Sequence, residues 1–392
     1  MSALDWRELY AQNQAAIAAS GIHMPASTLT PLTAVSLPGE TGHRQLPNVL
    51  RKRGPATNPR ARPPDLRSAA RGTPNADARA LVHIPRGLDP EVPAAVVCML
   101  HGCTQDPATF AAATAMNETA DRHGFVVIYP AQAHGRNANR CWNWFMPAHQ
   151  RRGAGEPDLI VRTTQLLIAR GAQTVDSRRV FVAGLSSGGA MALVLAACYP
   201  DVFAAVAIHS GLPYRSANDL ATAFAAMGHP DRATDGHGIH SAMGTHARPL
   251  PSLVIHGTAD RTVAPKNSGH ILAQTMHANH LAAPHRCAHD PARPTTAQRT
   301  RATGGLFYTR NQWIDAHGTL MHESIEVEDL GHAWSGGTPG GSYTDPRGPS
   351  ATQAIWAFFA QAALAPIPSA PEHDQHHDGR QIPRPGRRRL VP

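Results

Sequence analysis

The segment that most restricts the fold of this chain is Gly184-Leu185-Ser186-Ser187-Gly188, which joins two apolar stretches of different character. Residues 180–183 resemble a buried strand, whereas residues 190–197 are typical of a buried helix. Gly-x-Ser-x-Gly between a strand and a helix predicts a nucleophile elbow, a sharp turn that lifts the serine hydroxyl above the edge of a sheet. Ser186 is therefore a candidate nucleophile, and its position predicts where its partners should lie.

Strands and helices alternate along the region that contains this turn. The patterns predict strands at 79–85, 92–100, 125–130, 179–184, 203–208, 251–256 and 322–329. They predict helices at 107–122, 156–170, 187–199, 267–280 and 350–363. Several of these strands are almost continuously apolar, as expected of parallel strands that are buried on both faces. The alternation predicts an α/β fold with a mainly parallel central sheet flanked by helices.

The composition changes on either side of the predicted α/β domain, which spans residues 78–366. Residues 1–77 are predicted to form a mostly disordered arm, in which only residues 5–18 have the spacing of a short amphipathic helix. Residues 367–392 are rich in Pro, His and Arg and predict a disordered basic tail.

The formal net charge is +8, and much of the excess is arginine near the two ends. Such arms can contact nucleic acid, an acidic surface or anionic lipid, but a solvated tail is the simpler interpretation. No nucleic-acid-binding motif accompanies the charge, so no nucleic-acid partner is expected. His373, His376 and His377 also favour a solvated tail over a weak metal site. Neither a metal nor a cofactor is expected.

The longest apolar run, around residues 190–198, is too short to cross a bilayer, so no transmembrane segment is expected. Residues 1–21 contain Asp5, Arg7 and Glu8 and lack the apolar centre of a signal peptide. These features predict a cytoplasmic protein and leave secretion by another route open. The five cysteines do not make a disulfide scaffold, although they allow a single bridge.

Two residues that follow later strands complete a candidate catalytic triad. An activated serine needs a base, and in α/β-hydrolases the acid and the histidine follow the serine in that order. Asp260 comes just after the strand at 251–256, and His332 comes just after the strand at 322–329. The carboxyl ends of parallel strands form the site in such sheets. We therefore expect His332 to accept the Ser186 proton and Asp260 to orient the imidazole.

Other acids and histidines fit these roles less well. Asp201 follows the serine too closely in the chain, directly after the nucleophile helix. His256 and His322 lie at a strand end and a strand start, and His256 is expected to pack beneath the Asp260 loop.

The negative charge that develops during acyl transfer requires N–H donors that are already in place. One expected donor is the backbone N–H of Ser187, the residue after the nucleophile. The other is expected in the loop after the strand that ends at Leu100, which reads His101-Gly102-Cys103-Thr104-Gln105. Cys103 is the predicted second donor.

Six motifs in this order resemble the esterase family of polyhydroxybutyrate depolymerases. They are Met99 to Gln105, Cys141 to Phe145, Gly184 to Gly189, His209 to Gly211, His256 to Asp260 and Gly331 to Gly337. The resemblance covers essentially all of residues 78–366. It implies an α/β-hydrolase that cleaves short-chain polyhydroxyalkanoate esters with the triad named above. It also implies a bridge between Cys103 and Cys141, which fits an oxidising compartment better than the cytosol.

Two features depart from the family pattern. One is the basic, Pro-containing stretch 284–304, and the other is that neither a signal peptide nor a separate polymer-binding domain, both usual in secreted members, is visible. Amorphous granules or soluble oligomers are therefore easier expected substrates than crystalline polymer, and a granule surface is an expected partner. Among the aromatic residues near the motifs, Trp334 is expected to line the substrate cleft. Trp142 and Trp144 fit the cleft and core packing equally well. The basic stretch 284–304 has no predicted role.

The sequence thus predicts a serine esterase that hydrolyses poly(3-hydroxybutyrate), related short-chain polyhydroxyalkanoate esters, or their oligomers through an acyl-enzyme. The principal alternative is a carbohydrate esterase of the feruloyl or acetyl-xylan type, since those enzymes share the elbow and loop motifs. A non-catalytic granule-binding protein and an aminopeptidase-like hydrolase are weaker alternatives.

Overall fold

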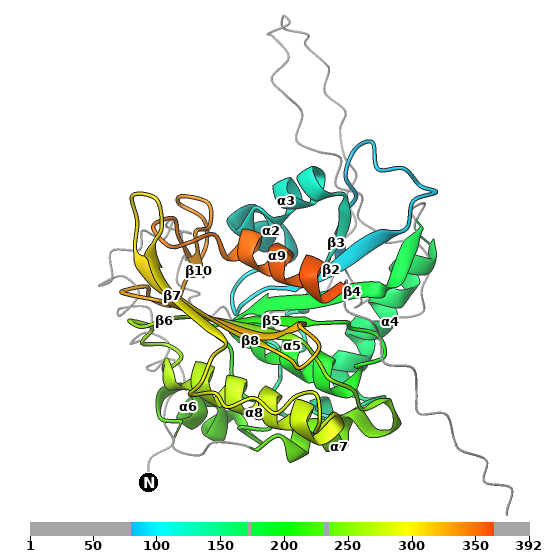
Figure 1. The fold of residues 1–392 in the computed structure, drawn as a ribbon. Coiled ribbons are helices and arrows are strands. Elements are labelled where there is room, and N and C mark those ends of the chain that lie inside the picture. The colour runs from blue at the N-terminus through cyan, green and yellow to red at the C-terminus, as the bar shows by residue number, and fades with distance from the viewer. Residues whose placement is uncertain (1–79, 171–173, 231–234, 364–392) are drawn as a thin grey trace, which may run out of the picture.

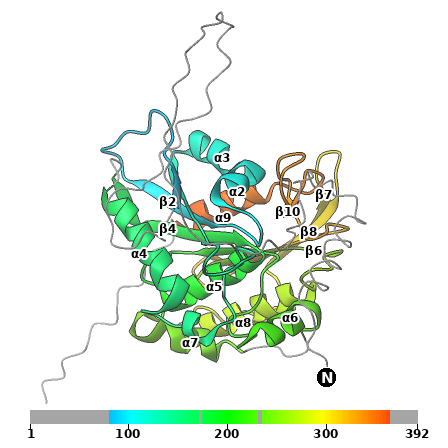
Figure 2. The same cartoon turned by 180° about the vertical axis from the view of Figure 1, so that it is seen from behind.

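The computed structural model describes residues 80–170, 174–230 and 235–363. A twisted sheet lies between two layers of helices, with α2, α3 and α9 on one face and α4, α5, α7 and α8 on the other (Figure 1). From behind, α6, α7 and α8 again lie on the face opposite α2, α3 and α9 (Figure 2). This three-layer arrangement is the predicted α/β fold.

The elements alternate along the chain much as the sequence predicts. The strands of the large sheet are β1 (Ala80–His83), β2 (Ala94–Leu100), β3 (Phe125–Pro130), β4 (Val175–Leu185), β5 (Val206–His209), β6 (Ser252–Gly257), β7 (Thr296–Arg301), β8 (Phe307–Ile314) and β9 (Leu320–Val327). A small second sheet contains β10 (Trp334–Ser335) and β11 (Thr344–Asp345). The α-helices are α2 (Pro107–Thr114), α3 (Met116–His123), α4 (Gly155–Arg170), α5 (Ser187–Cys198), α6 (Leu220–Gly228), α7 (His237–Met243), α8 (Lys266–Ala282) and α9 (Ala351–Ala363). Two short 3₁₀ helices are η1 (Pro147–His149) and η2 (Gly244–His246).

The strand order in the large sheet is β1-β3-β2-β4-β5-β6-β9-β8-β7. All pairs from β3 to β9 are parallel, whereas β1 at one edge and the β7–β8 hairpin at the other add antiparallel pairs. The chain order reverses between β2 and β4, which are neighbours with Leu100 opposite Gly184. Ligand sites of open α/β sheets lie at such a reversal, beyond the carboxyl ends of the strands.

The sheet separates two hydrophobic cores, and β2 contributes to both because its side chains alternate between the faces. Val96, Cys98 and Leu100 pack with α4 and α5, whereas Val97 and Met99 pack with α2, α3 and α9. All seven residues of β2 are buried. This burial explains why the strand is apolar throughout its length.

The structure corrects two predicted elements. The helix predicted at 107–122 is divided into α2 and α3, because Ala115 between them has φ +52°, a left-handed conformation that interrupts helical hydrogen bonding. The strand predicted at 203–208 begins only at Val206.

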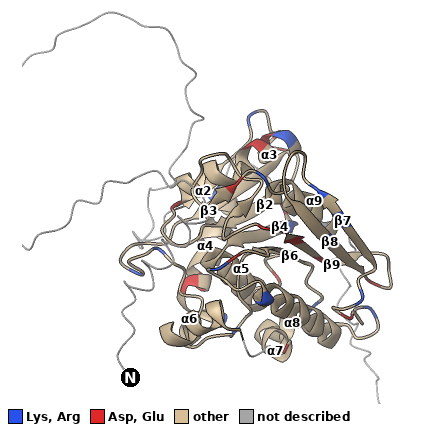
Figure 3. Ribbon diagram, turned by 90° about the vertical axis from the view of Figure 1, so that its left-hand side faces the viewer, with Lys and Arg blue, Asp and Glu red and all other residues tan. Residues whose placement is uncertain are grey.

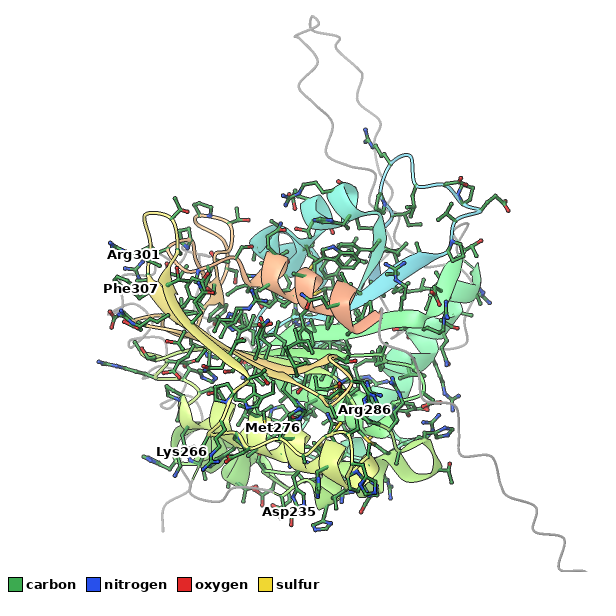
Figure 4. The ribbon with its side chains drawn as sticks, in the orientation of Figure 1. Asp235, Lys266, Met276, Arg286, Arg301 and Phe307 are labelled. Atoms are coloured by element: carbon green, nitrogen blue, oxygen red, sulfur yellow. A yellow bond between two sulfur atoms is a disulfide. The ribbon has the colours of Figure 1, made fainter. Side chains whose placement is uncertain are left out.

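The sequence patterns missed α6, α7, β7 and β8. The stretch 284–304 contains β7, an exposed edge strand that pairs with β8. Arg301 and Phe307 lie beside each other on this hairpin, with the guanidinium 5.1 Å from the ring centre (Figure 4). Arg286, in the same stretch, pairs with the buried Asp315 just beyond β8. At least part of the basic stretch therefore has a structural role at the sheet edge.

The predicted arm 1–77, its helix at 5–18 and the tail 367–392 lie outside the described residues, as do His373, His376 and His377. The division into arm, domain and tail therefore stays a prediction. In the part of the chain that is described, no helix has both the length and the hydrophobicity needed to cross a membrane.

The docking of α9 on the sheet provides a test of the core. Phe359 of α9 is fully buried and stacks on Phe181 of β4, with ring centres 4.6 Å apart. We expect Phe359→Ala to lower the free energy of unfolding by about 3–5 kcal/mol, because it removes apolar contacts and leaves a cavity. Urea denaturation measures the change. Phe307→Ala, at a ring that is 38% exposed, should cost only about 1 kcal/mol, and equal losses would contradict this account.

Candidate active site

Ser186 occupies the tight turn between β4 and α5. Its backbone has φ +57° and ψ −121°, a strained conformation for a residue with a side chain. The flanking glycines are sterically required, because a Cβ on Gly184 would lie 2.4 Å from the Gly188 backbone. A Cβ on Gly188 would lie 2.2 Å from the Leu100 carbonyl oxygen. The turn therefore has the geometry of the predicted nucleophile elbow.

Asp260 and His332 form a buried hydrogen-bonded pair at the ends of two neighbouring strands. They follow β6 and β9, which are parallel partners with Gly257 opposite Val327. His332 Nδ1 lies 2.8 Å from Asp260 Oδ2. His332 and Ser186 line the same cavity, so the structure brings the predicted serine, acid and histidine into one region.

The surroundings of Asp260 keep its carboxyl group ionised. Burial alone would raise its pKa, but the attraction of His332 and hydrogen bonds from His256 and His332 lower it well below the usual range. Asp260 Oδ1 also accepts the backbone N–H groups of Thr262 and Val263, each at 2.9 Å. An ionised carboxylate only accepts hydrogen bonds, so His332 Nδ1 must carry the proton, which in a neutral imidazole leaves Nε2 as the acceptor.

The rival acids and bases have other partners. The Asp201 carboxylate pairs with Arg152 at 2.6 and 2.7 Å near the surface. His322 is fully buried between Ser252 and Asn279, and burial, together with the nearby His289, lowers its pKa to about 3. His256 donates from Nε2 to the Val263 carbonyl and lies 3.3 Å from Asp260, beneath the loop as expected.

The loop after β2 lies beside the elbow and has the features of an oxyanion hole. Within the described residues, neither the Cys103 nor the Ser187 amide N–H has a hydrogen-bond acceptor. Both residues line the cavity next to Ser186. The Gly102 N–H is occupied instead, by the Gln105 side chain at 2.9 Å. Two unoccupied N–H groups beside a serine hydroxyl can stabilise a developing oxyanion.

A disulfide joins Cys103 to Cys141 and so ties this loop to the segment before α4. The Thr104 N–H donates to the Asn139 carbonyl in the same region. The remaining cysteines in the described part of the chain, Cys98, Cys198 and Cys287, are free and buried. Burial raises the pKa of Cys98 to about 12 and the pKa values of Cys198 and Cys287 to about 11.

The three tryptophans named from the sequence have different positions. Trp142 and Trp144 line the cavity, although both are almost fully buried. Trp142 also donates from Nε1 to the His101 carbonyl at 3.0 Å, so it supports the loop that contains Cys103. The prediction that Trp334 lines the substrate cleft is wrong, because Trp334 is not among the residues that line the cavity. Its indole is 1% exposed, packs between Phe110 and His209, and donates to Thr352.

His209 is a structural link that the sequence interpretation missed, although its motif was recognised. Its carbonyl accepts the Ser186 N–H at 2.9 Å, and its Nε2 accepts the Ser335 N–H at 3.1 Å. It therefore connects the elbow with the loop that carries His332. Burial, reinforced by the charges of His256 and His332, lowers its pKa to about 3, so the ring is neutral. The available signal was a histidine directly after the strand predicted at 203–208; in the structure it is the last residue of β5.

Glu156, at the start of α4, was also missed. It is a buried carboxylate that accepts hydrogen bonds from the Asn143 backbone N–H at 2.7 Å and from the side chains of Asn143 and Gln132. Burial would raise its pKa, but hydrogen bonds from His149, Gln132 and Asn143 lower it overall. Glu156 thereby holds the Trp142–Trp144 segment in place. Nothing in the local sequence distinguishes this glutamate from a solvated one at a helix start.

The cavity has a volume of about 440 Å³ and opens above Ser186. Leu212, Leu220, Ala223, Phe224 and Met227 line it together with Trp142, Trp144 and Phe145. No Asp, Glu, Lys or Arg of the described chain is among its lining residues. An uncharged and mostly apolar cleft fits a neutral substrate.

The elbow, the paired acid and histidine, and the strand order define an α/β-hydrolase. Residues 80–290, just over half of the chain, match the family described as Esterase PHB depolymerase. The chain belongs to that family, as the motifs predicted.

Individual relatives extend the comparison. The chain is 32% identical over 272 residues to poly(3-hydroxyalkanoate) depolymerase C of Paucimonas lemoignei, covering 68% of this chain and 60% of the relative. It is 33% identical over 193 residues to feruloyl esterase B of Neurospora crassa, covering 46% and 63%. A solved structure of an acetyl xylan esterase from Aspergillus awamori matches with a TM-score of 0.58 at 20% identity, covering 76% of this chain and 99% of that one. This structural likeness supports the fold alone.

Removing the negative charge of Asp260 tests the role of the Asp260–His332 pair. An asparagine at this position would have a single acceptor oxygen, which cannot accept both from the Thr262 and Val263 N–H groups and from His332 Nδ1. The imidazole would then lose its charged partner or adopt the wrong tautomer, so we expect kcat of Asp260→Asn on a soluble ester to fall by about 10³- to 10⁴-fold. Steady-state kinetics measure the loss. Asp201→Asn makes the same chemical change at the surface pair with Arg152 and should leave kcat nearly unchanged. Equal kcat values for the two variants would contradict the assignment.

Opening the disulfide tests the support of the Cys103 loop. We expect Cys141→Ser to lower kcat about 10-fold or more, because the Cys103 N–H is then less firmly held where the oxyanion forms. Dithiothreitol should lower kcat of the natural chain similarly and should have no further effect on the variant. Unchanged kcat after complete reduction of the natural chain would show that the bridge does not support the site.

Proposed function

We propose that this protein is a serine esterase that hydrolyses poly(3-hydroxybutyrate), related short-chain polyhydroxyalkanoates, or their oligomers. The observation that carries the proposal is the convergence of Ser186, His332 and two unoccupied N–H groups on an uncharged cleft. The 32% identity to a poly(3-hydroxyalkanoate) depolymerase extends over more of the chain than the identity to the feruloyl esterase. The chain spans less than two thirds of the length of either relative, so substrate identity is part of the proposal.

The proposed reaction has two stages. Ser186 Oγ attacks the acyl carbon while its proton passes to His332 Nε2. The resulting oxyanion accepts hydrogen bonds from the backbone N–H groups of Cys103 and Ser187. His332 then gives the proton to the leaving alkoxide, and an acyl-enzyme remains. A water molecule then loses a proton to His332 and attacks this ester. His332 passes that proton to Ser186 Oγ as the acyl–oxygen bond breaks, which releases the hydroxy acid and restores both Ser186 and the neutral imidazole. Throughout, Asp260 keeps Nδ1 protonated and stabilises the imidazolium.

The uncharged lining favours an aliphatic polyester over a carbohydrate ester. A polyester of 3-hydroxybutyrate carries methyl groups and ester carbonyls but no hydroxyl groups along its chain. Sugar rings present many hydroxyls, and a site that binds them needs matching polar side chains. The wall contributed by Leu212, Leu220, Ala223, Phe224 and Met227 has no such groups, and the polar side chains of the lining come from other segments, among them Thr104, Gln105, Asn137, Asn139, Thr262 and Tyr343.

The compartment is a separate part of the proposal. A Cys103–Cys141 bridge persists in oxidising surroundings and is reduced in most cytosols. We therefore infer an oxidising location in place of the cytoplasmic or granule-associated one expected from the sequence. Alkylation of free thiols in freshly lysed cells, followed by mass spectrometry of the two cysteines, distinguishes these locations.

Turnover of a matched set of esters tests the function. We expect release of 3-hydroxybutyrate from soluble oligomers and amorphous polymer, with much lower kcat/KM on methyl ferulate and acetylated xylan. Ser186→Ala should reduce release by at least about 10⁴-fold, because it removes the nucleophile. Faster turnover of the ferulate or xylan ester would favour a carbohydrate esterase. A chain that neither turns over any ester nor labels at Ser186 with a fluorophosphonate would be a non-catalytic binder.

A further inference from the structure

Helix α6 is a surface helix without a charged residue. Its sequence, Leu-Ala-Thr-Ala-Phe-Ala-Ala-Met-Gly, contains one polar side chain, and the whole helix is tan in Figure 3. Leu220, Ala221, Thr222, Ala225 and Gly228 are nevertheless exposed, and Leu220 is 51% accessible. Surface helices usually present charged residues to water. Packing within the domain therefore explains the apolar residues on the buried face of α6 but not those on its exposed face.

The apolar surface of α6 is continuous with the cleft. Leu220, Phe224 and Met227 are spaced along one side of the helix and line the cavity above Ser186. Ala221 and Ala225 lie next to that side and face water. A substrate chain that leaves the cleft over Phe224 would thus meet further apolar surface.

A second exposed apolar segment borders the same cavity. Phe145 lines the cavity, and the following Met146 is 42% exposed. The Gln150 side-chain amide donates to the carbonyls of Phe145 and Ala217 at 3.2 and 2.9 Å, which joins this segment to the chain that leads into α6. The two exposed segments therefore border one mouth. We call them the apolar rim, comprising Phe145, Met146, Leu220, Ala221, Phe224 and Ala225.

The rim is firmly held in relation to the site. Asp219 and Thr222 form a capping box at the start of α6. At its other end, the Ala264 N–H donates to the Met227 carbonyl at 2.7 Å, and the Asn267 side chain donates to Ala226. Ala264 and Asn267 follow Asp260 closely in the chain. The exposure of α6 is therefore a fixed feature beside the catalytic acid.

We propose that the apolar rim is the surface by which this enzyme adsorbs to water-insoluble aliphatic polyester, feeding a chain segment from the rim to Ser186. The inference rests on the function proposed above and adds a polymer-binding surface within the catalytic domain. Exposed apolar surface that continues out of a cleft marks an interaction site. Neither α6 nor the cavity lining contains a Lys or Arg that could attract anionic lipid headgroups, so we favour a neutral polyester over a membrane.

Charged substitutions outside the cavity test the rim. Met146 and Ala225 are exposed and do not line the cavity, so Met146→Glu and Ala225→Glu should leave kcat/KM on soluble p-nitrophenyl butyrate within about twofold. Glutamate is well tolerated within a helix, so α6 should still form. The double variant should adsorb to amorphous polyhydroxybutyrate particles about 10-fold more weakly, because it places two charges against an apolar surface. Depletion from the supernatant measures adsorption, and release of 3-hydroxybutyrate from the particles should fall in parallel.

Ile84→Glu combined with Val92→Glu is the matched control, because it also places two glutamates on exposed apolar side chains, which are 45% and 56% accessible. Val92 precedes β2 and so lies at the sheet edge opposite the site. The inference fails if the control weakens adsorption equally, if the double variant adsorbs like the natural chain, or if the natural chain binds phosphatidylcholine vesicles but not the particles. If the natural chain does not hydrolyse soluble 3-hydroxybutyrate oligomers, the proposed function itself fails, whatever the adsorption result.

Discussion

The site depends on the close approach of the first turn of α5 to the carboxyl end of β2. Any side chain at Gly188 would collide with the Leu100 carbonyl, so helix and strand meet backbone to backbone. This contact brings the Ser187 N–H beside the loop that contains Cys103. Two amide dipoles from distant parts of the chain can therefore point at one oxygen atom. The disulfide, Trp142 and Glu156 then hold the second of these donors in place.

A second group of contacts relates the proposed base to the proposed nucleophile. Asp260 is buried, and a buried charge is tolerated only where hydrogen bonds replace its lost hydration. Two backbone N–H groups and the His332 ring satisfy it. His209 reaches across from the elbow to Ser335, so the loop carrying His332 and the turn carrying Ser186 share one rigid support. Its ring can accept from Ser335 only while neutral, and burial keeps it so.

The sequence was sufficient for the parts of the site that topology determines. In a parallel sheet every strand ends at the same edge, so a residue just after a strand, such as Asp260 or His332, has a predictable position. Trp334 was not predictable in this way, because its direction depends on the pairing of β10 with β11, ten residues further along. The β7–β8 hairpin was missed because β7 is polar and exposed, whereas β8 is mostly half-buried with polar residues at its centre, so neither strand has the apolar run that revealed the buried strands. The break at Ala115 arises from one backbone dihedral angle, which composition does not encode.

The three free cysteines have a consequence for how the chain acquires its covalent form. Thiol–disulfide exchange requires an accessible thiolate, and burial suppresses both accessibility and ionisation at Cys98, Cys198 and Cys287. Once the two cores have formed, only Cys103 and Cys141 remain able to react with an oxidant. Folding before oxidation would thus select one pairing out of the ten that five cysteines allow, with no need for an isomerase to correct mistakes. A chain oxidised before its cores close would have no such selection.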